Sequence, residues 1–409
     1  MADVKPPDPD DLLAQIRALP AAGPVLAAVE ARPGVYLVGG AIRDLLRGGQ
    51  PFDLDLVVEG DPVPVARRIG LDDVVVHDRF GTSTVSAGGF TYDVARSRRE
   101  TYPQPGALPE VEPAPLKEDL GRRDFTVNAL AVGLGEPGRG RLTAYPGSLD
   151  DLEQETLRVL HDASFIDDPT RLLRLARYRG RLGFTIDPHT QALAQQAVDE
   201  DALGTISGPR IGNELRLLAR EEDPVAAFQA LRELGLDEAI HPGFGLADEA
   251  AARRALALLP RGERADRLIL AAASLDLPAA ELRTLLDRLG FEAGDRDAIL
   301  AAARATELSR ALAAAQSPSE VAATARRAGA EAVALAGALG AEAAARQWFE
   351  TLRGVSLEID GRDLLRAGVP EGPALGEGLA AALAAKLDGR ARGRDEELAA
   401  ALESLGKDS

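Results

Sequence analysis

Residues 37–46 read LVGGAIRDLL and residues 52–58 read FDLDLVV, and these two segments predict the architecture of the N-terminal part of the chain. Val35–Val38 is a short apolar run followed by two glycines, and Ala41–Leu46 has helical character, so a strand, a Gly-Gly turn and a helix should follow one another. Such a turn lets backbone N–H groups and a helix N-terminus face an anion. The first segment therefore predicts a phosphate-binding turn.

The second segment places Asp53 and Asp55 two residues apart in an extended run. Because side chains alternate along a strand, both carboxylates should point to one face. Hard carboxylate oxygens suit Mg²⁺, which often also holds substrate phosphates. In an acidic protein such a pair can be two exposed carboxylates without a functional role. Its position after the glycine turn favours the interpretation that both are metal ligands. Turn and carboxylates together predict a nucleotidyl-transfer site, in which metals activate a hydroxyl and stabilise departing pyrophosphate.

The composition limits the class of protein. The chain has 409 residues, a net charge of −18 and no cysteine. This length predicts about two to four folding units. The absence of cysteine excludes disulfides and thiolate metal sites and fits a reducing compartment. The acidic, proline-rich N-terminus lacks a signal-peptide core and no run of about 18 apolar residues occurs, so we expect a cytoplasmic protein without membrane contact. No pattern indicates an oligomeric state.

Strand and helix signals are mixed in the first third of the chain, and helical spacing dominates beyond Asp150. The expected strands are Val35–Val38, Leu54–Val58, Val74–His77, Thr82–Ser86 and Thr91–Ala95, and the expected helices are Asp10–Glu30, Ala41–Leu46, Pro62–Ile69 and Lys117–Leu130. Tyr102–Pro115 reads as a loop. The expected fold class is α+β, with a mixed β-sheet head at 1–140 followed by an all-α neck at 141–205, body at 206–335 and tail at 336–409.

These segments resemble the head domain of the DNA polymerase beta-like nucleotidyltransferases, and more narrowly the class II CCA-adding tRNA nucleotidyltransferase and poly(A) polymerase family. Further motifs follow in the family's order, at residues 122–130 (RRDFTVNAL), 167–174 (DDPTRLLR), 208–215 (GPRIGNEL) and 359–364 (IDGRDL). Several motifs in one order are far more specific than any one alone. Residues 144–148 depart from the family's hinge, because alanine and serine stand where an aspartate and a glycine are usual.

The resemblance implies roles for several residues of the head. Gly39, Gly40 and Arg43 would contact the triphosphate. Asp93 stands where the superfamily often has a third strand carboxylate and would be catalytic, although it could instead be a structural partner of Arg96.

The second motif implies contacts to the sugar and the phosphates. Arg123 would contact the nucleotide, and Asp124 would lie near the ribose, where accepting a hydrogen bond from the 2′-OH would favour ribonucleotides. Asn128 would support both residues from one helical turn further on. The alternative is an ion-paired helix start, since an aspartate near a helix N-terminus is favourable in itself.

The third motif implies recognition of the base. Asp168 and Arg171 are three residues apart on an expected helix and should lie side by side. An acceptor beside donors matches the amine and ring nitrogen of cytosine or adenine, whereas guanine and uracil present carbonyl oxygens to the carboxylate. The pair should thus admit CTP and ATP and reject GTP and UTP. The alternative is a simple ion pair within the helix.

The net charge argues against an RNA ligand, because backbone phosphates select basic surfaces. Five arginines nevertheless lie within eleven residues, at Arg171, Arg174, Arg177, Arg179 and Arg181. This cluster is either a solvated helix face or a local basic channel. The flanking motifs favour the channel, and we include Arg174 and Arg177 among the nucleotide-binding residues.

The resemblance therefore implies template-independent, Mg²⁺-dependent transfer of CMP and AMP from CTP and ATP to the 3′ end of tRNA, with the acceptor end as the bound partner. An enzyme restricted to A or to CC addition and a poly(A) polymerase are alternatives with the same chemistry. An inactive RNA-binding homologue is another, against which the intact Asp53 and Asp55 argue. A small-molecule nucleotidyltransferase is disfavoured, because the base-reading motif and the long helical tail would have no use.

One segment bears on which nucleotides are added. In this family, enzymes that stop at CC typically have a shortened segment between the third strand and the second motif. Residues 96–115 resemble the full-length form and contain five prolines. We expect this segment to be a mobile element over the nucleotide that permits A addition.

Overall fold

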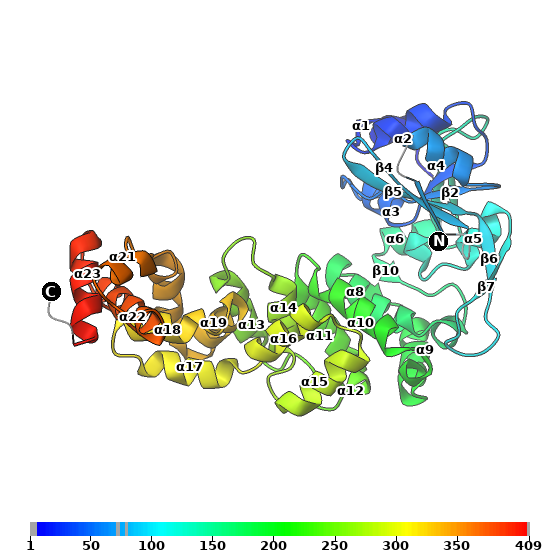
Figure 1. Cartoon of the computed structure of the whole chain (residues 1–409). Helices are drawn as coiled ribbons and strands as arrows, with labels where there is room; N and C mark the ends of the chain where they lie inside the picture. Colours follow the sequence, from blue (N-terminus) through cyan, green and yellow to red (C-terminus); the bar gives the residue numbers. More distant parts are fainter. Residues whose placement is uncertain (1–5, 71–73, 78–80, 407–409) are drawn as a thin grey trace. The chain divides into compact units, whose positions relative to one another are not determined.

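The computed structural model describes residues 6–70, 74–77 and 81–406. The chain divides into two compact units, of which the first comprises Met1–Ser207 with Leu234–Ala239 and the second comprises Gly208–Glu233 with Ile240–Ser409. Every described strand belongs to the first unit, which carries the mixed sheet (Figure 1). The predicted α+β fold class, a sheet-bearing head followed by helices, is confirmed.

A mixed sheet of seven strands, counted over the described residues, forms the centre of the head, in the order β3-β4-β5-β2-β1-β8-β9. The strands are β1 (Val35–Val38), β2 (Leu56–Val58), β3 (Val74–His77), β4 (Thr82–Ala87), β5 (Phe90–Arg96), β8 (Leu130–Gly133) and β9 (Leu142–Ala144). Strands β2 and β5 pair in parallel, and the other neighbours pair antiparallel. The sheet continues past residue 140, where we predicted the head to end.

Alternation along the strands gives the sheet two apolar faces. Val35 and Leu37 of β1 pack in the larger core together with helices α1 (Pro9–Ala18), α2 (Ala22–Val29), α3 (Gly40–Leu46) and α4 (Val63–Ile69), of which α1, α2 and α4 are seen grouped in Figure 1. Val38 points to the opposite face, where it packs with α5 (Leu116–Gly121). This second face carries the candidate site.

Two helix predictions were too long. The expected helix Asp10–Glu30 is divided between α1 and α2, because Pro20 interrupts it. The expected helix Lys117–Leu130 ends at Gly121, and after a short 3₁₀ turn at Thr126–Asn128 the chain enters β8. Pairing of β8 with both β1 and β9 decides its conformation, which a local helical pattern cannot report.

The segment expected to be a loop is partly a hairpin. Strands β6 (Arg98–Thr101) and β7 (Glu110–Pro113) pair antiparallel, so that only residues 102–109 connect them. Beyond Asp150, where only helices were expected, β10 (Thr156–Leu157) and β11 (Thr185–Ile186) form a short parallel pair. The other elements of this unit are α6 (Ser148–Glu153), α7 (Ser164–Asp167), α8 (Thr170–Leu182), α9 (Pro188–Asp199), a 3₁₀ turn at Ala202–Thr205 and most of α12 (Leu236–Ile240).

All regular elements in the described residues of the second unit are helices, which are joined by loops. Its helices are α10 (Gly208–Ala219), α11 (Pro224–Glu233), α13 (Glu249–Leu258), α14 (Ala265–Ala272), α15 (Ala279–Arg288), α16 (Ala293–Ala302), α17 (Ala305–Ala314), α18 (Pro318–Arg326), α19 (Ala330–Ala336), α20 (Glu342–Gln347), α21 (Gly361–Arg366), α22 (Pro373–Leu387) and α23 (Gly393–Ser404). No helix in the described part of the chain combines the length and apolar character that crossing a membrane requires.

Candidate active site

The carboxylates of Asp55 and Asp93 lie on the same face of the sheet. Leu56 of β2 is in register with Val94 of β5, and both of these side chains belong to the larger core. Because side chains alternate, the residues one position earlier in each strand point to the opposite face. On that face, the Thr84 hydroxyl donates a hydrogen bond of 2.7 Å to Oδ1 of Asp93.

Asp53 and Asp55 both precede β2, and alternation along the chain puts Asp53 on the same face as Asp55. Strand β2 begins at Leu56, yet the carbonyl of Asp55 accepts a hydrogen bond of 3.0 Å from the Val38 amide, which extends the pairing with β1. Leu54 is buried in the core between the two aspartates. The alternation predicted from the sequence therefore holds in this extended segment.

The carboxylates are electrostatically coupled. Asp55 is accessible to solvent. The protein atoms around its carboxyl nevertheless raise the pKa of this group through desolvation. The charges of Arg123 and Arg174 oppose this rise, while those of Asp93 and Asp53 add to it. A divalent cation would relieve the repulsion among these acidic groups.

The donor chemistry fits Mg²⁺. Mg²⁺ is usually held by one or two carboxylates, with substrate phosphates and water completing its coordination. Within the described ranges, no three His, Asp or Glu side chains come together as a ready-made cation site. Asp53 and Asp55 therefore fit a site that the substrate completes.

The glycine turn lies close to an arginine of the second motif. Gly39 has a φ of +76°, which favours glycine, and its amide donates to the carbonyl of Leu130 at 2.9 Å. A Cβ atom at Gly39 would lie 3.1 Å from Nη1 of Arg123. Gly40, the first residue of α3, lies over the guanidinium of Arg43. The absence of a side chain at Gly39 lets the turn pack closely against Arg123, whereas a Cβ atom at Gly40 would make only an ordinary contact with Arg43.

Arg43, which we predicted to contact the triphosphate, is buried and paired with other residues of the protein. It is 1% exposed, and its guanidinium donates to Asp44 at 2.8 and 2.9 Å and to Oδ1 of Asn128 at 2.6 Å. A buried guanidinium needs such partners, and here the protein supplies them. Arg43 therefore connects α3 to Asn128 and supports the turn from within the protein.

Asp119 of α5, a residue that our sequence analysis did not single out, organises the second motif. Its carboxylate is fully buried and accepts from Arg122 at 2.8 and 3.0 Å and from Arg123 at 3.0 Å. Burial alone would raise the pKa of Asp119, but the two guanidiniums lower it. The spacings of three and four residues to these arginines were the available signal. Nε of Arg123 is left without a partner among the described residues.

Asp124, Asn128 and Arg174 form one buried network. Asp124 is 6% exposed and accepts from Arg174 at 2.5 and 2.9 Å and from Asn128 at 3.0 Å. Its burial favours a raised pKa, but these donors, above all the charge of Arg174, lower the pKa to about 2. Oδ1 of Asp124 also accepts from the backbone amide of Phe125, and Oδ2 accepts from Arg174. Both oxygens therefore already have donors within the protein. The predicted hydrogen bond to a ribose would therefore share an oxygen with this network.

The Asp124 network predicts a distinct acid response. A carboxyl whose pKa is lowered on folding stabilises the protein above about pH 4 and loses this contribution as the pH falls through about 2, a change worth about 2 kcal/mol. We expect the pH-dependent part of the stability difference between wild type and Asp124→Asn to disappear over that range. Urea unfolding of both proteins at a series of pH values measures it. A difference that stays constant between pH 5 and pH 2 would contradict the assignment.

Tyr178 of α8 is the centre of the arginine cluster and was also missed by our sequence analysis. Its ring meets Phe125 edge to face, with centroids 5.8 Å apart. The guanidinium carbons of four arginines lie 5.3 to 5.8 Å from the ring centroid, at Arg43, Arg174, Arg177 and Arg181. An aromatic face attracts cations and holds them together despite their repulsion. The basic cluster predicted from the sequence is therefore partly an internal stack.

The two residues predicted to read the base do not share a helix. Asp168 lies between α7 and α8, where its Oδ1 accepts from the amide and hydroxyl of Thr170 at 3.1 and 2.6 Å. Pro169 interrupts the helical pattern there. Arg171 is 4% exposed and donates to the Ser164 hydroxyl and to the Arg122 carbonyl, each at 2.7 Å. Each member of the pair is thus fixed by other groups.

Comparison with known proteins places these features in a family. Residues 35–158 match the model described as the poly A polymerase head domain, and residues 183–246 match the model described as a probable RNA and SrmB-binding site of polymerase A. A solved structure of the CCA-adding enzyme of Thermotoga maritima with tRNA superposes with a TM-score of 0.78 at 27% identity, covering 98% of this chain and 99% of that one.

Curated relatives differ in length. The A-adding tRNA nucleotidyltransferase of Geobacter sulfurreducens is 36% identical over 89% of this chain but only 44% of its own length, and that of Aquifex aeolicus aligns over 26% of its length. This chain thus spans less than half of these two relatives. The CC-adding tRNA nucleotidyltransferase of Deinococcus radiodurans is 35% identical over 90% of this chain and 89% of its own. This similarity across nearly the whole of both chains shows that the chain belongs to the tRNA nucleotidyltransferase and poly(A) polymerase family.

Proposed function

We propose that the protein transfers CMP and AMP from CTP and ATP to the 3′ end of tRNA and thereby builds or repairs the CCA end. The observation that carries the proposal is the position of Asp55, whose carboxyl lies within the electrostatic influence of Asp53, Asp93 and Arg123. Family membership and the names of the relatives support the same chemistry.

In the proposed reaction, the terminal 3′-hydroxyl of the RNA attacks the α-phosphorus of the nucleotide, and pyrophosphate leaves. Asp53 and Asp55 would hold Mg²⁺, which supplies charge neutralisation at the attacking and leaving oxygens. Arg123 presents donors to the phosphates beside Gly39, while Asp119 fixes its direction. Arg174, held by Asp124, presents a further positive charge to the nucleotide.

We propose that Asp168 and Arg171 select the base. The carboxylate of Asp168 accepts from an exocyclic amine, and Arg171 donates to the neighbouring ring nitrogen. A guanidinium has five N–H donors, so its bonds to Ser164 and Arg122 leave others for the base.

Replacing Asp168 by alanine should reduce use of CTP and ATP and narrow discrimination against UTP and GTP by roughly 10- to 100-fold, because the group that repels carbonyl oxygens is removed. Thr170→Val is a matched variant that keeps the carboxylate but removes the hydroxyl that donates to it, and its effect should be smaller and in the same direction. Steady-state incorporation of each nucleotide measures both. Unchanged base preference together with lower stability would favour a purely structural role for Asp168.

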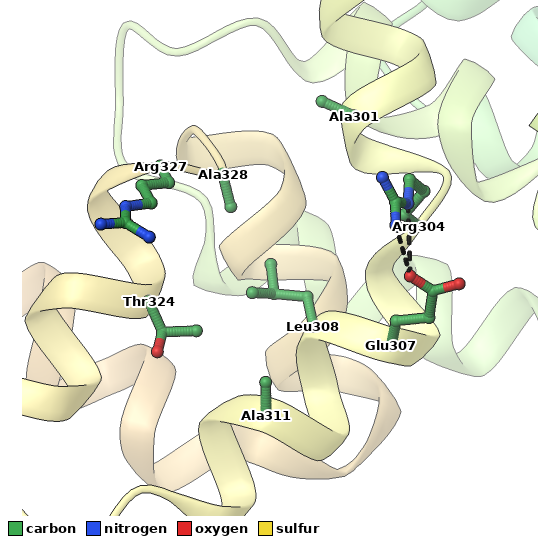
Figure 2. Close-up of a pocket in the computed structure, with 8 residues that line it drawn as sticks. All are labelled: Ala301, Arg304, Glu307, Leu308, Ala311, Thr324, Arg327 and Ala328. Carbon is green, nitrogen blue, oxygen red and sulfur yellow. Dashed lines mark hydrogen bonds and ion pairs between the residues drawn. The ribbon is translucent and has the colours of Figure 1, made fainter.

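For the RNA partner we propose phosphate contacts in the helical unit. A hollow of about 330 Å³ is lined by Leu308 and Ala311, and Figure 2 shows Arg304 and Arg327 on opposite sides of it. Arg304 pairs with Glu307 at 2.8 Å, and both of these side chains are largely exposed. An exposed pair contributes little and exchanges readily for a phosphate contact. Such local positive charge offsets the acidic net charge where RNA binds.

A second candidate is A addition alone, which the Geobacter and Aquifex relatives named as A-adding enzymes favour. One experiment separates the candidates. The protein is incubated with tRNAs that end before CCA, after C and after CC, and incorporation of each nucleotide is followed separately. We expect CMP on the first two substrates and AMP on the third. Use of ATP alone on the third substrate would replace full CCA addition by A addition, and no incorporation on any would refute the proposed function.

A further inference from the structure

The nucleotidyl-transfer site described above does not use the carboxylate of Glu100, which is buried near the loop end of strand β6. Its side chain is 7% exposed and accepts from three different residues. Oε1 accepts from Nη1 of Arg122 at 2.8 Å and from Nε of Arg98 at 3.0 Å, and Oε2 accepts from the Tyr102 hydroxyl at 3.0 Å. A carboxylate is rarely buried without such a set of donors. Glu100 therefore joins the hairpin to the second motif.

Arg122 extends this connection to the residue that we propose reads the base. Its side chain donates to both Glu100 and Asp119, whereas its backbone carbonyl accepts from Nη2 of Arg171 at 2.7 Å. Two charge-assisted contacts restrict the position of Arg122, so its carbonyl is a fixed acceptor for Arg171. Hydrogen bonds thus run without a break from Tyr102 through Glu100 and Arg122 to Arg171.

Tyr102 also lies close to both proposed base-reading residues. The pKa of Tyr102 is raised, first by burial and then by the negative charge of Glu100. The charges of Arg171 and Asp168 also act on this pKa, in opposite directions. The phenol therefore stands at the junction of the hairpin and the proposed base-reading residues.

The connecting loop of the hairpin has a second attachment to the same region. The amide of Gly106 donates to the carbonyl of Ile166 in α7 at 3.1 Å, two residues before Asp168. Gly106 is buried with a φ of +69°, and a Cβ atom there would lie 2.2 Å from Oγ1 of Thr205. Only glycine fits this close approach. The connecting loop thus lies near the proposed base-reading segment at two points, Tyr102 and Gly106.

We propose that Glu100 and Tyr102 are positioning residues for base selection, which orient the Arg171 guanidinium by way of Arg122. This inference rests on the proposed function, because it assigns how the same site chooses its nucleotide. A small displacement of the Arg122 carbonyl would turn the guanidinium and change which base edge it matches. The hairpin thereby acts on selectivity without touching the base.

The same hairpin offers a matched control. Arg99 and Glu112 face each other across β6 and β7 and form an ion pair at 2.5 Å, but both side chains are more than half exposed. This pair has no hydrogen bond or ion pair with Arg122 or Arg171 among the described residues. Replacing Glu112 removes an acidic side chain from the hairpin but leaves the hydrogen bonds that join Glu100, Arg122 and Arg171 in place.

The test compares Tyr102→Phe and Glu100→Gln with Glu112→Gln in the full-length protein. We expect the first two variants to lower the ratio of kcat/KM for CTP over UTP, and for ATP over GTP, by roughly 10-fold. Tyr102→Phe removes a single hydroxyl and keeps the test decisive if Glu100→Gln fails to fold. Glu112→Gln should change these ratios by less than about twofold, because the exposed pair contributes little.

A merely structural role would produce a different result. If both variants lowered the use of all four nucleotides equally and only reduced the melting temperature, the positioning role would be overturned. Equilibrium binding of CTP and UTP to each variant without RNA gives a second readout, and we expect the same fall in their ratio. Lack of incorporation by the wild type on every tRNA would refute the proposed function, while the binding ratios would still decide the role of Glu100 and Tyr102.

Discussion

Replacing either Asp53 or Asp55 by alanine is expected to abolish nucleotide incorporation while leaving the fold and RNA binding largely intact. Both carboxylates lie just before β2, on the sheet face that also carries Asp93. Neither carboxylate has a hydrogen-bond or ion-pair partner among the described residues on which folding would depend. Loss of a metal-binding carboxylate removes charge stabilisation of several kcal/mol in the transition state. A loss of about 4 kcal/mol corresponds to a rate decrease of roughly a thousandfold.

Single-turnover incorporation at saturating Mg²⁺, together with melting temperature and tRNA binding, measures this effect. Asp61→Ala is a suitable control, because Asp61 is an exposed aspartate beyond the other end of β2. Among the described residues, its side chain accepts only from the Val63 amide, at 3.1 Å. The control should retain incorporation close to that of the wild type. Wild-type rates in the Asp53 and Asp55 variants would remove these residues from the proposed metal site.

Deleting Pro103–Pro109 should eliminate addition of the terminal A while sparing addition of C. The deleted residues connect β6 and β7, whose last paired residues are Thr101 and Glu110. After the deletion this last pair would open and a loop of about three residues would close the hairpin. The Gly106 contact to α7 would be lost, and with it the element expected to rearrange the site for the larger base.

Extension of tRNA ending in CC with ATP, and of tRNA ending before CCA with CTP, measures the two activities separately. A replacement of the same residues by a Gly-Ser segment of equal length is the matched variant, since it keeps the hairpin length but removes the prolines and the packing of the loop. We expect it too to add C and to add A poorly. Terminal A addition at the wild-type rate by the deletion variant would show that the loop has no part in it.

Local patterns predicted much of the head. β1 and β3 have the predicted bounds, and β4 and β5 differ from prediction by one residue at their ends. A short strand bounded by glycine and aspartate is recognised from residues that are adjacent in the chain. It can therefore be identified without tertiary information. The alternation of Asp53, Leu54 and Asp55 was likewise sufficient to place both carboxylates on one face.

Errors arose where distant pairing outweighs local pattern. Leu130 looks helical in sequence, but pairing with β1 and β9 makes its segment a strand. The tertiary environment overrides weak local propensity in such central strands. Pro169 similarly separates Asp168 from the helix that carries Arg171, although the spacing of the two residues suits a helix.

The sequence by itself determined the family, the glycine turn, the paired carboxylates and the order of the motifs, because each of these depends on residues that are close together in the chain. Only the tertiary structure decided that Arg43 is an internal support held by Asn128 and that Glu100 connects the hairpin to Arg122. These contacts join residues 85 and 22 positions apart. Burial selects such partners after folding has brought them together, since a buried charge must be compensated wherever its partner lies in the chain.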